Sequence, residues 1–454
     1  MYLIKLRYNL SQTHYSTINA EQFMFALLIY RVILLLLMPF LLLALLFRSI
    51  SNPQYRQRLS ERLGFFPNTC SSKCHNKGGI VVHAASVGEV IALTPFVEQL
   101  LKQYPHLPIT VTTFTPTGSA QVKKQFGTRV QHAFLPLDVF PCTQLFLTRL
   151  QPKLMIFMET ELWPNLINQC SSKKIKLLLI NGRLSANSMK NYQKINALIK
   201  PTLNHFDKIL CQSQDNLNNF LQLGADIDRC KMSGNLKFDI SINIEIRAKQ
   251  AKLAKLLPES RPLWLVASTH KGDEEITLLA FKIIKKIFPE LLLIIVPRHP
   301  ERFNIVANLC INQGYSLAKR SENICVSEQD IWLLDTLGEL MAAYALADIV
   351  TMGGSFSHIG GHNPLEPALF KKPIIVGNDM SNFMEILTQL QQNKGIVQLS
   401  SAENDNYQQL AQAVINLLED KEAANFLGSR AHKVVLNNQG ASSRTLAQVQ
   451  ELLK

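Results

Sequence analysis

The sequence predicts an α/β protein with two Rossmann-like domains, each a parallel sheet wrapped by helices, behind an apolar N-terminal helix. Three observations support this prediction. Short β-branched runs recur along the chain, each followed by a polar turn and a helix-like pattern. The alternation pauses at 240–262, where the chain is charged and helical, and then restarts. Residues 23–47 are almost wholly apolar and precede both series.

The length of 454 residues exceeds what one compact core usually holds, so two domains are expected. Apolar residues make up 47% of the chain and charged residues 18%, which is typical of a globular protein. The expected segments are a disordered extension (1–22), an anchor helix (23–47), a first domain (48–239), a connection (240–262) and a second domain (263–454). The terminal helix of the second domain has the option of crossing back to the first.

The net charge of +13 favours an anionic partner. No arginine-rich tail, RNA-binding aromatic signature or zinc-finger spacing supports a nucleic acid, so a phosphorylated ligand or an acidic membrane surface is expected. Cys70, Cys74 and His75 lack a second ligand pair, which argues against a zinc site. The scattered remaining cysteines predict reduced thiols in the cytoplasm.

The apolar run from Phe23 to Phe47 is long enough to span a bilayer. Four arginines follow it by residue 62 with one glutamate among them, and this positive flank predicts that the domains are cytoplasmic. Arg31 and Pro39 interrupt the run, so a helix lying in the membrane interface remains the alternative to a full crossing.

Polar side chains follow the predicted strands of the first domain, where parallel sheets collect their ligands. Glu89 follows the strand at Ile80–Ala84, and Glu159 follows the strand at Leu154–Met158. Arg183 and Lys237 come after later strands and turns, so all four are expected along one rim. The alternative for each is a solvated loop charge, and Glu89 at a helix start also suits the helix dipole. Further strands are expected at Ile109–Phe114, Lys176–Ile180 and Lys208–Cys211.

In the second domain, Arg298 follows a strand predicted at Leu291–Val296, where it favours an anion contact. The stretch TMGGSFSHIGGHNPLEP, residues 351–367, follows another apolar run. Asn363 suits a helix N-cap, Pro364 the first helical position and Glu366 the third. A helix start behind glycines favours phosphate, although Glu366 reaching back to its cap is the competing interpretation. Strands are also expected at Leu263–Ala267 and within Lys372–Gly377. Neither domain contains a dinucleotide-binding or P-loop motif.

Five motifs, in this order, resemble those of the 3-deoxy-D-manno-octulosonic acid (Kdo) transferases. They are HAASVGEV (83–90), METELWPN (158–165), SGNLKFD (233–239), VPRHPERF (296–303) and GGHNPLEP (360–367). The resemblance runs from the apolar segment to the end of the chain and leaves out residues 1–20.

The resemblance implies an inverting, metal-independent glycosyltransferase of the GT-B architecture, with two domains facing across a cleft and an anchor in the inner membrane. It would move Kdo from CMP-Kdo onto a tetraacylated, bisphosphorylated lipid A precursor (lipid IVA) in lipopolysaccharide biosynthesis, without a cofactor. By motif match, Glu89 is expected to be the proton acceptor, and Glu159 and Lys237 the transition-state stabilisers. The expected CMP contacts are Pro297, Arg298, Leu337, Gly338, Glu339, Asn363, Pro364, Leu365 and Glu366.

Two rival functions fit parts of the sequence. A nucleotide-sugar epimerase on a similar frame would not need the apolar segment. A nucleotide-binding membrane scaffold would give no reason for Glu89, Glu159 and Lys237 to share a rim. The sequence does not indicate how many Kdo residues are added.

Overall fold

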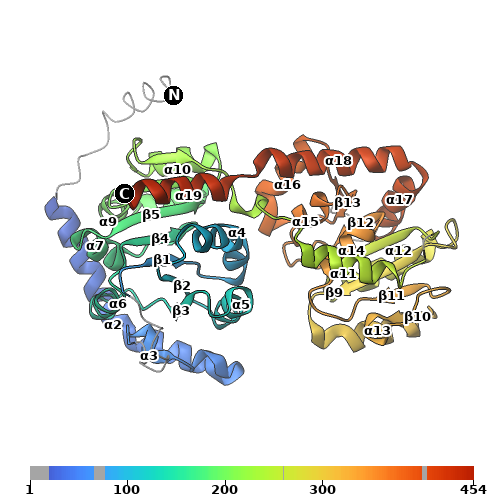
Figure 1. Cartoon of the computed structure of the whole chain (residues 1–454), viewed down its shortest axis with the longest axis horizontal. Helices are drawn as coiled ribbons and strands as arrows, with labels where there is room; N and C mark the ends of the chain where they lie inside the picture. Colours follow the sequence, from blue (N-terminus) through green and yellow to red (C-terminus); the bar gives the residue numbers. More distant parts are fainter. Residues whose placement is uncertain (1–19, 66–76, 259, 401–405) are drawn as a thin grey trace. The chain divides into compact units, whose positions relative to one another are not determined.

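The computed structural model describes residues 20–65, 77–258, 260–400 and 406–454. The chain divides into two compact units, drawn in Figure 1. Unit 1 comprises Met1–Asp239 and Gly440–Lys454, and unit 2 comprises Ile240–Gln439. The expected cysteine pair at positions 70 and 74 lies outside the described residues, as does most of the N-terminal extension.

Unit 1 is built on a parallel sheet with the strand order β3-β2-β1-β4-β5-β6-β7. The order reverses between β1 and β4, which are paired neighbours, so loops leaving these two strands meet at the carboxyl edge. The strands are β1 (Ile80–His83), β2 (Ile109–Thr113), β3 (Gln131–Phe134), β4 (Leu154–Met158), β5 (Lys176–Gly182), β6 (Lys208–Cys211) and β7 (Cys230–Met232).

Helices cover both faces of this sheet, and apolar clusters fill the two layers between them. They are α4 (Val87–Gln103), α5 (Pro116–Phe126), α6 (Phe140–Leu150), α7 (Pro164–Ser172), α8 (Ala186–Gln193), α9 (Asn196–Leu203) and α10 (Gln214–Gln222). The apolar N-terminal helix is α2 (Ala20–Ser51), and η2 (Pro53–Tyr55) and α3 (Leu59–Arg62) connect it to the sheet.

Unit 2 repeats this architecture with the strand order β10-β11-β9-β8-β12-β13-β14, again parallel. Here the order reverses between β8 and β12. The strands are β8 (Leu263–Thr269), β9 (Leu292–Pro297), β10 (Leu317–Lys319), β11 (Ile331–Leu333), β12 (Ile349–Met352), β13 (Ile374–Val376) and β14 (Val397–Gln398).

The longer helices of unit 2 are α11 (Ile244–Ala254), α12 (Asp273–Ile284), α13 (Phe303–Asn312), α16 (Met384–Gln392), α17 (Asn406–Glu419) and α18 (Lys421–Asn438). Two shorter helices, α14 (Leu340–Leu346) and α15 (Leu365–Leu369), carry candidate site residues at their starts. One core cluster packs α12, α13 and α17 against the sheet.

The last helix, α19 (Ala441–Leu452), belongs to unit 1, where it packs on α4. Asp239 caps its start, because its carboxylate accepts hydrogen bonds from Gly440 N at 2.6 Å and Ser442 N at 2.5 Å. The residues expected as a connection, 240–262, include α11, which packs on α14 within unit 2.

Candidate active site

The acidic residues that were expected along one rim of unit 1 gather where the strand order reverses. Glu89 lies in the first turn of α4, just past β1. Its two carboxylate oxygens accept hydrogen bonds from Ala85 N and Ser86 Oγ, each at 2.9 Å. Ser86, the N-cap of α4, in turn accepts from Glu89 N at 3.4 Å, so the hydrogen bonds at this helix start fix the carboxylate.

The pKa of Glu89 lies above its usual range. Burial is the main cause, and the negative charges of Glu159 and Glu161 add to it. The hydrogen bonds from Ala85 and Ser86 act in the opposite direction and keep the ionised form accessible. The expected acids therefore lie close enough to perturb one another.

Glu159 follows β4 in a strained backbone conformation, with a φ of 57°. Its N–H donates to Ile180 O at 3.0 Å, which fixes the turn against β5. Two residues on, Glu161 accepts a hydrogen bond from the indole of Trp163 at 2.8 Å. Glu161 also lies 3.5 Å from Nε2 of the fully buried His83. A non-glycine residue at positive φ is uncommon and stores some backbone strain.

Lys237 lies in the short helix η3 (Leu236–Phe238), which packs against α4. The buried side chain of Asn181 fixes this segment by accepting a hydrogen bond from Leu236 N at 2.9 Å. Asn235 accepts from Lys237 N at 2.9 Å. The structure thus places Glu89 and Lys237 on packed elements, while the Arg183 side chain is exposed after β5.

In unit 2 the predicted anion contact, Arg298, follows β9 and has an exposed side chain. Its N–H donates to Thr269 O at 3.0 Å, at the end of the neighbouring strand β8. The positive charge of Arg298 lowers the pKa of both Glu366 and His362, so these three side chains share one electrostatic environment.

The glycine-rich stretch packs tightly against the end of β8. A Cβ on Gly353 would lie 2.6 Å from Ser268 O, so only glycine fits there. The next residue, Gly354, has a φ of 70° and donates its N–H to Asp273 Oδ2 at 2.7 Å. The loop after β12 is therefore fixed to the start of α12.

The helix expected to begin at Pro364 begins one residue later, with Pro364 as its N-cap, and spans only Leu365–Leu369. Asn363 still satisfies its first turn by accepting from Leu365 N at 3.2 Å. Burial raises the pKa of Glu366 to about 7, against the Arg298 charge and a hydrogen bond from the Asn363 side chain. The capping alternative for Glu366 thus involves the side chain of Asn363.

Leu337, Gly338 and Glu339 follow β11 and precede α14, whose N-cap is Glu339. Glu339 pairs with Arg320 at 3.0 Å and accepts a hydrogen bond from Thr336. Gly338 has a φ of 84°, and Leu337 projects outward with 67% of its surface exposed. Because β11, β9, β8 and β12 are neighbours, these residues share the carboxyl edge with Arg298.

Three histidines meet at this edge, and the sequence did not predict their contact. The rings of His270 and His362 stack at 5.1 Å with their Nε2 atoms 2.9 Å apart, and His299 lies 5.3 Å from His270. Burial lowers the pKa of His362 to about 3, and the Arg298 charge contributes. The available signal was one histidine after each of three predicted strands, but only strand order brings them together.

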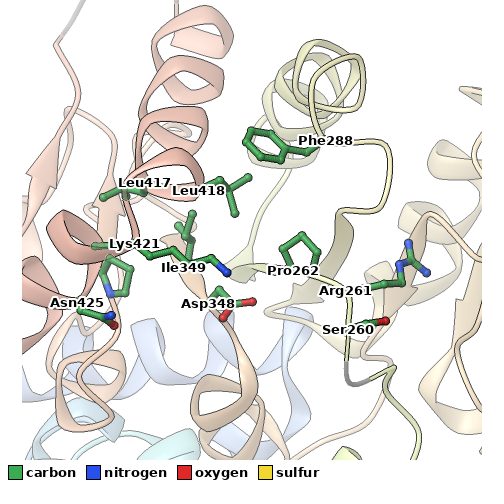
Figure 2. A pocket seen from close by; sticks show the side chains of 12 residues that line it. Ser260, Arg261, Pro262, Phe288, Asp348, Ile349, Leu417, Leu418, Lys421 and Asn425 are labelled. Carbon is green, nitrogen blue, oxygen red and sulfur yellow. The ribbon is translucent and has the colours of Figure 1, made fainter.

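A cavity of about 410 Å³ lies at the opposite, amino edge of the unit 2 sheet. Figure 2 shows Lys421 and Asn425 on one side of it and Ser260 and Arg261 on the other. None of the expected site residues lines it. Within the described residues, no group of three or more His, Cys, Asp or Glu side chains is arranged to hold a metal ion.

Residues 57–240 match the family model described as 3-deoxy-D-manno-octulosonic-acid transferase (kdotransferase). The 3-deoxy-D-manno-octulosonic acid transferase of Haemophilus influenzae is 43% identical over 418 residues, which cover 92% of this chain and 96% of that protein.

Solved structures share the fold. UDP-GlcNAc 2-epimerase from Neisseria meningitidis matches with a TM-score of 0.56 at 13% identity, over 82% of this chain and 100% of that one. A glycosyltransferase from Rickettsia africae matches with a TM-score of 0.52 at 16% identity, over 84% of this chain and 99% of that one. At such identities the likeness shows the fold alone, the GT-B architecture. Sequence identity carries the further step: the chain belongs to the 3-deoxy-D-manno-octulosonic acid transferases, which are glycosyltransferases.

Proposed function

We propose that this protein transfers Kdo from CMP-Kdo to a tetraacylated, bisphosphorylated lipid A precursor in lipopolysaccharide core biosynthesis. Unit 2 binds the donor, and unit 1 binds the acceptor. The observation that carries the proposal is the half-buried Glu89 carboxylate in unit 1, fixed by two hydrogen bonds at the point where strand order reverses.

In the proposed reaction, an acceptor hydroxyl oxygen attacks the anomeric carbon of Kdo from the face opposite CMP, so the configuration inverts. The bond from that carbon to the phosphate oxygen breaks, and CMP leaves with its electron pair. Glu89 takes the proton of the attacking hydroxyl. Its raised pKa supports this role, because a carboxylate with a raised pKa is a stronger base.

Glu159 and Lys237 stabilise the charge that develops on the sugar and the acceptor in the transition state. The positive φ of Glu159 and the anchoring of η3 by Asn181 support a requirement for fixed positions.

In unit 2, Arg298 neutralises the CMP phosphate, which makes a divalent metal unnecessary for departure of the leaving group. The phosphate is lined by Pro297, Asn363, Pro364 and Leu365. Glu366 accepts hydrogen bonds from the ribose hydroxyls. The remaining CMP contacts come from Leu337, Gly338 and Glu339. Addition of EDTA is therefore expected to leave transfer unchanged.

The apolar helix α2 holds the protein on the cytoplasmic leaflet of the inner membrane, where a phosphorylated lipid acceptor is available. Its apolar window has a mean hydropathy of 2.6, which makes it a candidate membrane helix by composition and length. The net charge of +13 suits an anionic lipid surface.

The test of the chemistry is Glu89→Gln in a membrane assay with CMP-Kdo and lipid acceptor, with the product weighed by mass spectrometry. Loss of the base is expected to slow transfer by about 10²–10⁴-fold while CMP binding is retained. The matched control is Glu98→Gln, which removes an acid from the same helix at a surface pair with Arg129. Full transfer by Glu89→Gln would refute the base assignment.

A further inference from the structure

The two faces of helix α2 differ in chemistry. Helix α2 is part of unit 1, and a stripe of its side chains at spacings of three and four residues faces the rest of that unit, where α2 packs on α7 and α9 (Figure 1). This stripe consists of side chains that are buried or half-buried: Phe23, Leu27, Tyr30, Arg31, Leu34, Met38, Leu42 and Leu45. It contains both polar residues of the segment 23–47, Tyr30 and Arg31.

Both polar side chains are bonded to unit 1. The Tyr30 hydroxyl donates to Asp138 Oδ2 at 2.8 Å, and Arg31 Nε donates to Asn165 Oδ1 at 2.8 Å. The Arg31 guanidinium also lies 4.6 Å from the ring centre of Phe140. Asp138 is buried and accepts from Asn165 N and Leu166 N, at the start of α7. The anchor helix and α7 are therefore joined by one hydrogen-bond network.

The outer face is apolar from Met24 to Phe47. Its exposed side chains are Met24, Phe25, Leu28, Ile29, Val32, Ile33, Leu35, Leu36, Leu37, Phe40, Leu41, Leu43, Leu46 and Phe47. Leu36 and Phe40, in the middle, are each 67% exposed. A continuous apolar face of this size marks an interaction surface.

Contacts with unit 1 run along most of the helix. Near its start the Phe23 ring lies 5.7 Å from that of His205, and towards its end Leu42 packs on the cluster that contains Leu137 and Val139. Residues 23–45 of a helix span about 33 Å. The hydrocarbon core of a bilayer is about 30 Å thick. A helix that crossed it upright would have to lose these contacts or carry polar parts of unit 1 into the lipid.

We propose that α2 lies in the plane of the membrane, with its outer face inserted into one leaflet and its inner stripe bound to unit 1. Lipid is the occupant that fits, because the face has no polar group to pair with a protein. Arg48 and Arg56 are exposed near the end of the helix, where they can meet anionic headgroups. The inference rests on the proposed membrane attachment and adds its geometry.

The test labels both ends of the helix with a membrane-impermeant maleimide. Glu21→Cys and Gln57→Cys, both at exposed positions, are made separately in a background with Cys70, Cys74 and Cys325 changed to Ser. The other described cysteines are buried. The proposal expects both variants to label in inside-out membrane vesicles and neither to label in spheroplasts.

Labelling of Glu21→Cys only in spheroplasts would show a crossing helix and overturn the in-plane geometry, while membrane attachment would stand. A different outcome would overturn membrane attachment itself: the protein is recovered in the soluble fraction without detergent. This holds whether it is then a monomer or a dimer that covers the outer face.

A second measurement tests the bonds to unit 1. Arg31→Leu makes the helix more apolar but removes its bond to Asn165, so proteinase K is expected to cut between α2 and β1 about tenfold faster in vesicles. Arg48→Leu removes the same charge from an exposed position and is expected to leave the rate unchanged. Equal cleavage rates for both variants and the parent would overturn the proposed docking of α2.

Discussion

The stability of unit 2 is expected to depend on pH through Glu366. Burial raises the pKa of this half-buried carboxyl from 4.5 to about 7. The folded protein therefore holds the proton more tightly than the unfolded chain, so folding stability is fully present below pH 4.5 and is lost as the pH rises to 7. Such a rise in pKa corresponds to about 3 kcal/mol.

Glu366→Gln removes this titration while it keeps the shape of the side chain. At pH 8 the free energy of unfolding is expected to rise by up to about 3 kcal/mol, whereas at pH 4.5 the change should stay below about 0.5 kcal/mol. Urea unfolding followed by tryptophan fluorescence measures this. Trp264 and Trp332 are fully buried in unit 2, so a Trp163→Phe background reports on that unit alone.

Glu301→Gln is the control, because the Glu301 side chain lies near the same strand end and is 75% exposed. It should change stability little at either pH. Destabilisation by Glu366→Gln at pH 8 would refute the argument that burial of this charge is costly. If Glu366 contacts the ribose, its replacement should stabilise unit 2 at pH 8 and also weaken CMP binding. Stabilisation with unchanged CMP affinity would therefore refute the ribose contact.

Two further changes test contacts that hold the elements around the candidate site in place. Asp239→Ala removes the acceptor for Gly440 N and Ser442 N, so the free energy of unfolding should fall by about 1–2 kcal/mol. Limited proteolysis of this variant should release residues 440–454. The control Asp239→Asn keeps one acceptor oxygen and should lower the free energy of unfolding less. Gly353→Ala would place a methyl 2.6 Å from Ser268 O, so the free energy of unfolding in urea should fall by roughly 1–3 kcal/mol and CMP binding should weaken. The control is Gly88→Ala, whose new methyl would have nothing nearer than 3.9 Å and should not destabilise the protein. Unchanged stability of Gly353→Ala would contradict the close packing of β8 and β12.

The sequence reveals the strands that form apolar runs, including the three-residue β13 (Ile374–Val376), and misses several short or partly polar ones. The apolar run at 292–297 marks β9, whose residues are all buried. In contrast, β3 (Gln131–Phe134) begins with two half-buried polar residues at the sheet edge, and β11 (Ile331–Leu333) is too short to show a period. Hydrophobic patterning detects burial on both faces of a strand, so a half-polar edge strand such as β3 escapes it, and a three-residue strand gives it little signal.

The same limit applies to the candidate site. The positions of Glu89, Glu159 and Arg298 at the sheet edges were predictable, because each comes soon after a strong strand and such positions share the carboxyl edge in any parallel sheet. The pairing of His270 with His362 was not, since 92 residues separate them and only the adjacency of β8 and β12 brings them together. A single sequence carries no information on which strands are neighbours.

The two interpretations of Glu89, helix cap and proton acceptor, are compatible. A carboxylate kept only as a cap gains from its hydrogen bonds and the helix dipole, and its pKa should fall. The Glu89 carboxylate accepts hydrogen bonds from Ala85 N and Ser86 Oγ at the helix start, and yet its pKa is raised because burial and the charges of Glu159 and Glu161 outweigh them. Gathering three acids at one edge works against folding stability, because their negative charges repel one another. Hydrogen bonds at the helix start therefore explain how Glu89 is positioned, and its raised pKa is consistent with the proposed role as proton acceptor.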